Sequence, residues 1–341
     1  MKAYLVKKFK RPIEAGEAPE PTVGEHDVLV DVHAAGLNLL DAKVRDGVFK
    51  VFLPYKAPFV LGHDLAGVVA GVGARVTRFG VGDEVYARPR DGQIGTFAER
   101  IAVHEDDLAR KPAALSMAEA ASVPLVALTA WQALVERANL QRGQKVLVHA
   151  GSGGVGTYAI QLAKHLGATV ATTTGTSNVD WVRGLGADVV IDYRTQDFET
   201  IVENYDVVLD SQSGDTLAKS LRVLKPGGIA IGIAGPPDPD FARQQGLHLP
   251  LRLVMALLSF KTRRAARRRG VRYSFLFMRA SGAQLGEITK LIDEGALRPI
   301  VDRTYPFDEA PQALAHVEGG RAKGKVVITM TSPTVTDADI R

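Results

Sequence analysis

The chain has 341 residues, 46% hydrophobic and 6% aromatic, which is enough apolar sequence for two globular domains and excludes a disordered chain. It has no cysteine, so disulfides, thiolate metal ligands and cysteine nucleophiles are excluded. The formal net charge of +4 is compatible with acidic ligands such as a phosphorylated cofactor and does not require nucleic acid. Residues 1–4 carry no apolar signal core and no apolar run reaches the ~20 residues of a membrane span, so we expect a cytoplasmic protein.

Residues 1 to about 117 are predicted to be all-β. Short apolar runs such as 28–32 and 66–70 are separated by glycine and proline turns, and no helical stripe of ~10 residues interrupts them. Residues 116–119, Ser-Met-Ala-Glu, then have the pattern of a capping box. They open an alanine- and leucine-rich stretch that we expect to be helical to Asn139, with a break at Pro124.

The stretch 145–156, KVLVHAGSGGVG, is the most informative part of the sequence. Its first six residues are typical of a buried parallel strand, and Gly151, Gly153 and Gly156 follow with the spacing G-x-G-x-x-G. An amphipathic helix comes next, so the pattern predicts a dinucleotide-binding turn. Gly151 would make the tight turn, Gly153 would let backbone N–H groups approach a pyrophosphate, and Gly156 would let the helix pack closely. The alternative is a glycine turn that only joins two elements.

Strand and helix alternate around and beyond this turn, which predicts a doubly wound parallel sheet of the α/β class. The expected elements are a helix at 155–166, a strand at 169–174, a helix near 178–184, strands at 188–193 and 206–210, a helix near 216–224 and a strand at 228–234.

The segment 249–260 is apolar and is followed by the basic run 261–269. We expect one helix that docks by its first half and is solvated at its second, with the arginines favoured by the helix dipole. A nucleic-acid patch is the disfavoured alternative, because no aromatic residues interleave with the arginines. After it we expect a strand at 273–278, helices at 284–294 and 306–317, a strand at 325–330 and a frayed polar tail at 331–341.

These residues resemble the medium-chain dehydrogenase/reductases. Ala150, Gly153 and Gly156 match the A-x-x-G-x-x-G of that family's nucleotide fold, and the stretches GLNLLDAK (36–43) and LGHDLAGVV (61–69) resemble its zinc-free quinone oxidoreductase branch. Within that branch, Lys43 and the stretch Phe275-Leu276-Phe277 resemble the NADPH-dependent alkenal and enone reductases. Over residues 1–330 the resemblance implies a Rossmann-like doubly wound sheet, at 119–280, inserted in a β-rich GroES-like catalytic domain formed by 1–118 and 281–341.

Zinc-dependent members of the family differ from this chain at their metal ligands. The zinc enzymes have one cysteine where this chain has Asn38 and a second near Leu125. Of their zinc ligands, this chain keeps only the histidine, His63. One imidazole cannot provide the three protein ligands of a catalytic zinc. We therefore expect no metal, and we expect His63 to be a hydrogen-bonded, structural or substrate-pocket residue.

The end of the second strand of the nucleotide fold, 174–178, bears on the choice of cofactor; we call it the rim. An NAD site places a carboxylate ~20 residues after the glycines, whereas the rim offers hydroxyls and an amide, with no carboxylate before Asp180. By resemblance Tyr193 also reaches a 2′-phosphate, and Arg194 could add charge. We therefore predict NADPH, although these threonines could simply favour a strand. The expected cofactor residues are Lys43, Gly151, Gly153, Gly154, Val155, Gly156, Thr174, Thr176, Ser177, Asn178, Tyr193, Ile233, Ala234, Phe275, Leu276 and Phe277.

Chemistry without zinc favours a substrate whose negative charge is delocalised as it forms, as in a quinone or a conjugated enone. The polar groups expected near an interdomain cleft are Asn38, Asp41, Lys43 and Tyr55. By resemblance Lys43 holds the substrate oxygen and cofactor hydroxyls, and Tyr55 is a weaker candidate for a pocket wall. From the sequence alone, Lys43 would be interpreted as an ordinary surface lysine.

Two other classes of function remain open at this point. One is an NADPH-binding protein that uses residues 263–269 on RNA, as a resemblance to zeta-crystallin-like proteins allows. The other is a structural protein that keeps the cofactor fold without turnover. We expect a small-molecule substrate as the partner, disfavour nucleic acid and expect no membrane. The strand at 273–278 could pair across a homodimer if it lies at a sheet edge.

Overall fold

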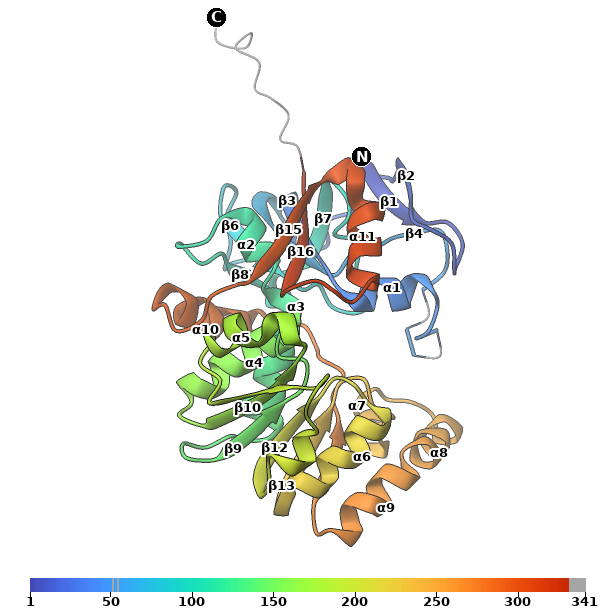
Figure 1. Ribbon diagram of the computed structural model, residues 1–341. Coiled ribbons are helices and arrows are strands. Elements are labelled where there is room, and N and C mark those ends of the chain that lie inside the picture. Colours follow the sequence, from blue (N-terminus) through green and yellow to red (C-terminus); the bar gives the residue numbers. More distant parts are fainter. Residues whose placement is uncertain (51, 54, 331–341) are drawn as a thin grey trace, which may run out of the picture. The chain divides into compact units, whose positions relative to one another are not determined.

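The computed structural model describes residues 1–50, 52–53 and 55–330, and the predicted polar tail at 331–341 lies outside these residues. The chain forms two compact units (Figure 1). Unit 1 contains Met1–Leu125, Arg279–Gly295 and Pro299–Arg341, and unit 2 contains Val126–Met278 and Ala296–Arg298. The sequence-based division falls at 118/119 and 280/281, a few residues from these boundaries. Within the described part of the chain, no helix is both long and apolar enough to cross a bilayer.

Unit 2 is built on a six-stranded parallel sheet in the order β11-β10-β9-β12-β13-β14. Its strands are β9 (Lys145–Val148), β10 (Thr169–Thr174), β11 (Val189–Asp192), β12 (Tyr205–Asp210), β13 (Leu224–Gly232) and β14 (Arg272–Phe275). The order reverses between β9 and β12, as in a doubly wound fold, which confirms the predicted fold class. In such sheets ligands bind at the carboxyl ends of the strands, near the reversal.

Helices connect the strands of unit 2. They are α3 (Pro124–Trp131), a π-helical stretch (Gln132–Arg137), α4 (Gly154–His165), α5 (Val179–Arg183), α6 (Gly214–Val223), α7 (Pro239–Gln244), α8 (Leu249–Leu258) and α9 (Phe260–Arg268), with 3₁₀ turns at Thr176–Asn178 and Phe198–Thr200. The helix α4 ends before Gly167, whose φ of +79° is the left-handed conformation that glycine adopts most easily. Sequence reasoning missed α7, in which the Asp238 carboxylate accepts a hydrogen bond from the backbone N–H of Phe241.

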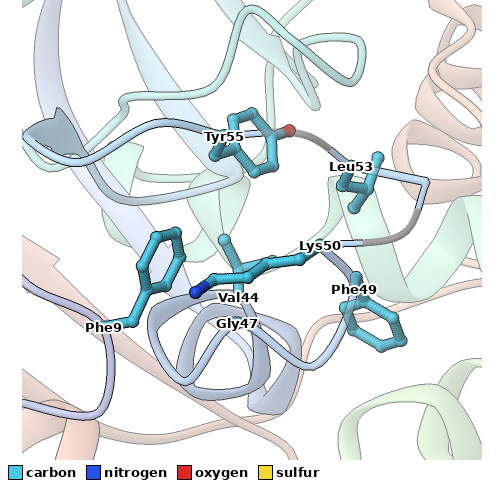
Figure 2. Close-up of a pocket in the computed structure, with 7 residues that line it drawn as sticks. All are labelled: Phe9, Val44, Gly47, Phe49, Lys50, Leu53 and Tyr55. Atoms are coloured by element: carbon cyan, nitrogen blue, oxygen red, sulfur yellow. The ribbon is translucent and has the colours of Figure 1, made fainter.

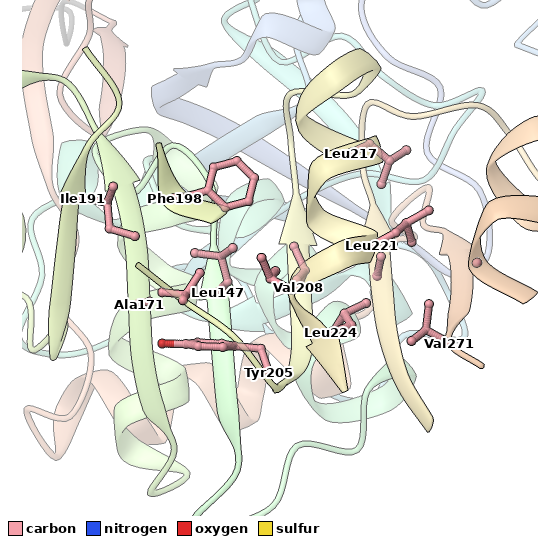
Figure 3. Packing of buried hydrophobic residues seen from close by; sticks show 14 residues of the cluster. Leu147, Ala171, Ile191, Phe198, Tyr205, Val208, Leu217, Leu221, Leu224 and Val271 are labelled. Carbon is pink, nitrogen blue, oxygen red and sulfur yellow. The ribbon is translucent and has the colours of Figure 1, made fainter. Parts of the chain in front are cut away.

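The core of unit 2 lies between the sheet and the helices that cover it. Figure 3 shows side chains from the strands, among them Leu147 and Val208, meeting Leu217 and Leu221 of α6. Ala266 of α9 belongs to the same buried cluster. Parallel strands buried on both faces are continuous apolar runs, which is why they could be identified from the sequence.

Unit 1 contains an antiparallel three-stranded sheet and a larger mixed sheet. The first has the order β2-β1-β4 and the second β15-β16-β3-β5-β6-β8, with β7 also paired to β3. The strands are β1 (Lys2–Val6), β2 (Glu14–Glu17), β3 (Asp27–Leu37), β4 (Phe59–Val60), β5 (Asp64–Val72), β6 (Glu84–Ala87), β7 (Arg100–His104), β8 (Leu108–Arg110), β15 (Val301–Pro306) and β16 (Lys325–Thr329). Strand β15 was not expected from the sequence.

The helices of unit 1 are α1 (Leu39–Arg45), α2 (Met117–Ala121), α10 (Gly282–Asp293) and α11 (Ala310–Glu318), with 3₁₀ turns at Glu105–Asp107 and Phe307–Glu309. The predicted capping box of α2 is present, since Ser116 and Glu119 exchange hydrogen bonds between side chain and backbone. Helix α1 corrects the prediction of an all-β region. It has seven residues, which is too short for a periodic apolar stripe to identify it.

Helices α8 and α9 also differ from the prediction. The apolar segment forms α8, but most of its leucines face solvent and Met255 is its one buried residue. The basic segment forms a separate helix, α9, whose Ala266 is buried. The expected docking of the apolar half holds for one side of α8 only, which packs against α7, because composition reveals how apolar a helix is and not which of its faces has a partner.

Candidate functional site

The glycine turn of unit 2 joins β9 to α4 at the carboxyl end of the sheet. Gly153 is the residue before the helix, in an extended conformation. A Cβ atom on Gly151 would lie 2.1 Å from the Thr172 hydroxyl oxygen, and one on Gly156 would lie 2.3 Å from the Ala150 carbonyl oxygen. Only glycine fits at both positions. The turn is therefore tight, and the first N–H groups of α4 point out of it without partners in the helix.

His149 lies buried beneath this turn and was not identified from the sequence. Burial lowers its pKa to about 4, so the ring is neutral near pH 7. Ser220 donates its hydroxyl proton to a backbone carbonyl, so it accepts from Nε2 of His149 at 2.8 Å. Nδ1 then accepts from the Thr173 hydroxyl at 3.1 Å, and that oxygen accepts from the Ala150 N–H. A neutral histidine in one tautomer thus connects the glycine turn to β10 and α6.

The rim begins at the end of β10. Thr174 is buried, whereas Thr176 and Ser177 are exposed. A Cβ atom on Gly175 would lie 3.5 Å from both the Tyr193 hydroxyl and Nε of Arg194, so these two side chains converge on the backbone of the rim. A phenol hydroxyl and a guanidinium are both hydrogen-bond donors. The arrangement therefore offers donors and a positive charge to an anionic group at the rim.

Asp192, at the end of β11, is a carboxylate near the rim that the sequence analysis did not consider. Thr176 donates a side-chain hydrogen bond to it, which is the main reason that its pKa is lowered. Its Oδ1 also accepts from the Arg194 N–H at 3.0 Å. The hydrogen bonds of the Asp192 carboxylate therefore hold the rim next to the segment that carries Arg194.

The remaining predicted cofactor residues lie just beyond neighbouring strands of unit 2. Ile233 and Ala234 follow β13, whereas Phe275 ends β14 and Leu276 and Phe277 follow it. The predicted strand at 273–278 is thus shorter, and its last residues form the segment after it. The carboxyl ends of parallel strands meet at one edge of a sheet, so these residues share an edge with the glycine turn and the rim.

A buried polar cluster surrounds the start of α1 in unit 1. The Asp41 carboxylate accepts from the Asn38 backbone N–H at 2.7 Å and lies 2.6 Å from Nδ1 of His63. Both Asp41 and His63 are fully buried. A carboxylate can only accept, so Nδ1 of His63 carries the proton. His63 is therefore held by a hydrogen bond, as the sequence analysis expects.

Asp64 and Lys325 extend this cluster. The Lys325 ammonium lies 3.1 Å from Oδ2 of Asp64 and 2.5 Å from Oδ1 of Asn38. The Asn38 amide donates to Asp64 at 2.9 Å, and the Leu125 N–H donates to its other oxygen at 2.8 Å. Burial raises the pKa of Asp64, and Lys325 and these donors act in the opposite direction. Sequence reasoning gave Asp64 no role, although it lies in the stretch 61–69 that carries the family resemblance, and it missed Lys325, which belongs to no recognisable motif.

Lys43 lies on α1 and is half-buried. Its ammonium group has no hydrogen-bond or ion-pair partner among residues 1–50, 52–53 and 55–330. Asn38 and Asp41, which we expected to orient it, instead bind Asp64, Lys325 and His63. They fix the start of α1 and hence the helix that carries Lys43.

Tyr55 lies in a small depression of unit 1 (Figure 2). The lining residues are Phe9, Val44, Gly47, Phe49, Lys50, Leu53 and Tyr55, and they surround about 150 Å³ of space that opens to solvent. The Tyr55 hydroxyl accepts from the Gly92 N–H at 3.1 Å, and burial raises its pKa. Tyr55 is thus a wall residue whose hydroxyl oxygen is bonded to a loop.

The side chains around His63 do not fit a catalytic zinc ion. Such an ion needs three protein ligands, and the chain has no cysteine to supply a thiolate. Nε2 of His63 is buried without a hydrogen-bond partner, but the neighbouring Asp64 is bonded to Lys325 and Asn38. Over the described ranges, no group of three histidine or acidic residues is arranged to hold a metal.

Two family models match the chain. Residues 24–113 match the alcohol dehydrogenase GroES-like domain, and residues 185–328 match a domain described as zinc-binding dehydrogenase. The second name describes a family that includes zinc enzymes, whereas the donor set of this chain lacks the zinc ligands.

Named relatives extend over most of the chain. The NAD(P)H oxidoreductase RTN4IP1 of Danio rerio mitochondria is 34% identical over 325 residues, covering 89% of this chain and 84% of the relative. The chloroplastic NADPH-dependent alkenal/one oxidoreductase of Arabidopsis thaliana is 36% identical over 318 residues, covering 90% and 73%. The quinone oxidoreductase structure from Coxiella burnetii matches with a TM-score of 0.85 and 31% identity, covering 97% of this chain and 99% of that one. The TM-score shows that the Coxiella burnetii structure has the fold described above.

Proposed function

This chain belongs to the medium-chain dehydrogenase/reductase family, and we propose that it is a zinc-independent reductase that uses NADPH. Its substrates would be quinones or the activated C=C bond of α,β-unsaturated carbonyls. The observation that carries the proposal is a half-buried lysine, Lys43, whose ammonium group has no partner in the described structure, in a chain that lacks a zinc-ligand set. The names of the alkenal/one and quinone oxidoreductase relatives support it.

The rim supports NADPH as the cofactor. Tyr193 and Arg194 converge on Gly175, beside the exposed hydroxyls of Thr176 and Ser177. These groups would hold the 2′-phosphate, while the N–H groups at the start of α4 would hold the pyrophosphate. The segments after β13 and β14 would line the nicotinamide end. The Asp192 carboxylate accepts hydrogen bonds from Thr176 and from the Arg194 N–H, and these bonds would reduce its repulsion of the 2′-phosphate.

Lys43 would act on the substrate oxygen. NADPH, when bound, would supply a hydride to the electron-poor β-carbon of an enone, or to a quinone, and water would supply the proton that completes the product. Negative charge then grows on the carbonyl oxygen, and the Lys43 ammonium donates a hydrogen bond to it. A delocalised enolate needs less stabilisation than a simple alkoxide, so a hydrogen-bond donor can replace a Lewis acid. Asn38 and Asp41 are positioning residues in this scheme, because they hold the start of α1.

The test uses NADPH carrying deuterium at nicotinamide C4 and a matched pair of substrates, an enone and its saturated ketone. We expect NADPH consumption with the enone and deuterium at the β-carbon of the product, measured by mass spectrometry and NMR. The saturated ketone should not react. Reduction of the ketone to an alcohol, with the enone untouched, would contradict the proposal. NADPH binding without turnover on any quinone or enone would favour a binding protein.

Two features of the proposal concern the protein in solution. The edge strand β14 could pair with the same strand of a second copy to form a homodimer. A measurement of molecular mass in solution would test this proposal. The cytoplasmic location also stays a prediction, because the relatives named above are mitochondrial or chloroplastic.

A further inference from the structure

The outer face of α8 is an exposed apolar surface. Six of the thirteen large apolar side chains that are exposed in the described residues lie within residues 249–260, namely Leu249, Leu253, Val254, Leu257, Leu258 and Phe260. Leu257 is 74% exposed and Leu253 is 59% exposed. Single exposed leucines are ordinary, but a continuous group of this kind marks an interaction surface.

The helices are anchored so that this face must point outward. Met255 and Ser259 are buried on the inner side of α8, and the Ser259 hydroxyl donates to the Met255 carbonyl. Leu249, Leu253 and Leu257 recur at every fourth position and share the opposite side. Figure 1 shows α8 and α9, in orange, at the edge of unit 2, next to α7 and α6.

The basic residues of α9 continue the same exposed surface. Ala266 lies in the core of unit 2, which turns the charged side chains outward. Within residues 260–269, the exposed cations that have no hydrogen-bond or ion-pair partner in the described ranges are Lys261, Arg264, Arg267, Arg268 and Arg269. Every charged side chain between Asp240 and Glu287 is a lysine or an arginine. The surface therefore combines apolar side chains with positive charge that nothing in its own segment neutralises.

We propose that α8 and α9 bind the surface of a bilayer that contains anionic phospholipids. Exposed leucines and a phenylalanine next to a run of arginines are the combination by which an interfacial helix binds such a surface. The leucines of α8 would enter the boundary between headgroups and acyl chains. The arginines of α9 would meet the phosphates, each adding attraction near a negative surface. We name the two helices together the lipid face.

A second copy of the chain or an RNA molecule would each match only one part of this surface, the apolar or the basic part. A second copy of the chain could cover the leucines, but a two-fold contact through this face would bring the two basic runs together, and residues 241–286 contain no carboxylate to pair with them. RNA could pair with the arginines, but it would leave the exposed leucines in water and would find one aromatic side chain, Phe260, for base stacking. An anionic bilayer matches the apolar and the basic part together.

The test is co-sedimentation of the full chain with vesicles of neutral phosphatidylcholine, alone or mixed with anionic phosphatidylglycerol, at physiological salt. We expect binding to the mixed vesicles, weaker binding as salt rises, and little binding to the neutral ones. The variant R264Q/R267Q/R268Q should bind the mixed vesicles on the order of 100-fold more weakly. The variant L253S/L257S should bind at least about 10-fold more weakly.

A matched control removes the same charge from unit 1. Lys8, Arg11 and Arg321 are exposed, and K8Q/R11Q/R321Q should bind the vesicles as the wild type does. If the control weakens binding as much as the arginine variant, only net charge matters and the proposal is wrong. No binding to either vesicle, a dimer that L253S/L257S dissociates, or RNA binding that R264Q/R267Q/R268Q abolishes would each overturn it.

The vesicle measurement contains neither NADPH nor substrate, so it does not depend on the proposed reductase activity. Turnover of a water-soluble quinone without vesicles should be unchanged in both variants of the lipid face. A protein that binds vesicles without reducing quinones would refute the proposed function alone. One that reduces quinones without binding vesicles would refute the lipid face alone.

Discussion

Nδ1 of His63 lies 2.6 Å from Oδ1 of Asp41, and both side chains are fully buried. Asp41 also accepts from the Asn38 backbone N–H. One carboxylate therefore satisfies two buried donors, a histidine and the backbone that precedes α1.

Replacing Asp41 by alanine should destabilise the protein. Both donors would lose their acceptor inside the protein, and a buried unsatisfied donor costs about 1–3 kcal/mol. We expect the free energy of unfolding to fall by about 2–4 kcal/mol in urea denaturation. Asp180, whose side chain is 99% exposed, provides the control, and Asp180→Ala should change stability by less than about 0.5 kcal/mol. An equally small effect of Asp41→Ala would show that the pair does not hold α1.

Lys325→Met should cost more, and the cost should depend on pH. It leaves the Asp64 carboxylate buried without its cation, which typically costs about 3–5 kcal/mol. Burial raises the pKa of Asp64, so the folded chain holds this proton more tightly than the unfolded chain. The contribution of Asp64 to stability therefore falls as pH rises from the unfolded value of 3.8 through the higher folded value.

Without Lys325 the pKa of Asp64 should rise further. The gap in stability between Lys325→Met and wild type should therefore be large at neutral pH and shrink in acid, where Asp64 is protonated. Urea denaturation at several pH values measures it. The double variant Lys325→Met with Asp64→Asn should recover part of the loss at neutral pH. A gap that does not change with pH would mean that Asp64 carries no charge in the folded chain.

The rim should make the enzyme prefer NADPH. Ser177→Asp places a negative charge beside the expected 2′-phosphate, and we expect kcat/KM with NADPH to fall at least about 10-fold, or ~1.4 kcal/mol. The value with NADH should change less. Ser177→Asn has a similar shape without the charge and should leave the preference nearly intact. If the wild type has an equal or better kcat/KM with NADH, the argument from the rim fails.

Lys43→Met should reduce catalysis. A donor to a developing oxyanion contributes about 10²–10³-fold to kcat, and we expect a comparable fall in kcat/KM on the best enone or quinone. NADPH affinity should change much less unless the lysine also holds the nicotinamide ribose, in which case both fall. The exposed Lys8→Met is the control. A rate within about twofold of wild type would remove Lys43 from the mechanism, since that is under ~0.5 kcal/mol.

Activity should survive a metal chelator, and elemental analysis should find far less than one zinc per chain. His63 is the one zinc-ligand position that remains, and its Nδ1 binds Asp41. A chain with one bound zinc that loses activity when the zinc is removed would contradict this prediction.

The parts of the fold with a regular sequence pattern could be predicted. Strand β10 has the predicted bounds, Thr169–Thr174, and the capping box at Ser116 is present. Both depend on residues that are close together in the sequence, so a local pattern is enough to predict them. The polar cluster could not be predicted. Lys325 lies 261 residues from Asp64, and as the first residue of a strand it looks like a surface lysine. The exposure of the α8 leucines could not be predicted either, because it depends on which distant residues pack against the helix.

The pairing of Asp64 with Lys325 also constrains the time at which unit 1 can fold during synthesis. The two residues are 261 positions apart, so at ~5–20 residues per second roughly 15–50 s separate their addition to the chain. During that interval β3 lacks its neighbour β16, and the Asp64 carboxylate lacks its cation. The strands of unit 2 are all made in between, so unit 2 can be complete while unit 1 is still open. A nascent chain should therefore resist proteolysis first in its middle and only at the end in its N-terminal part.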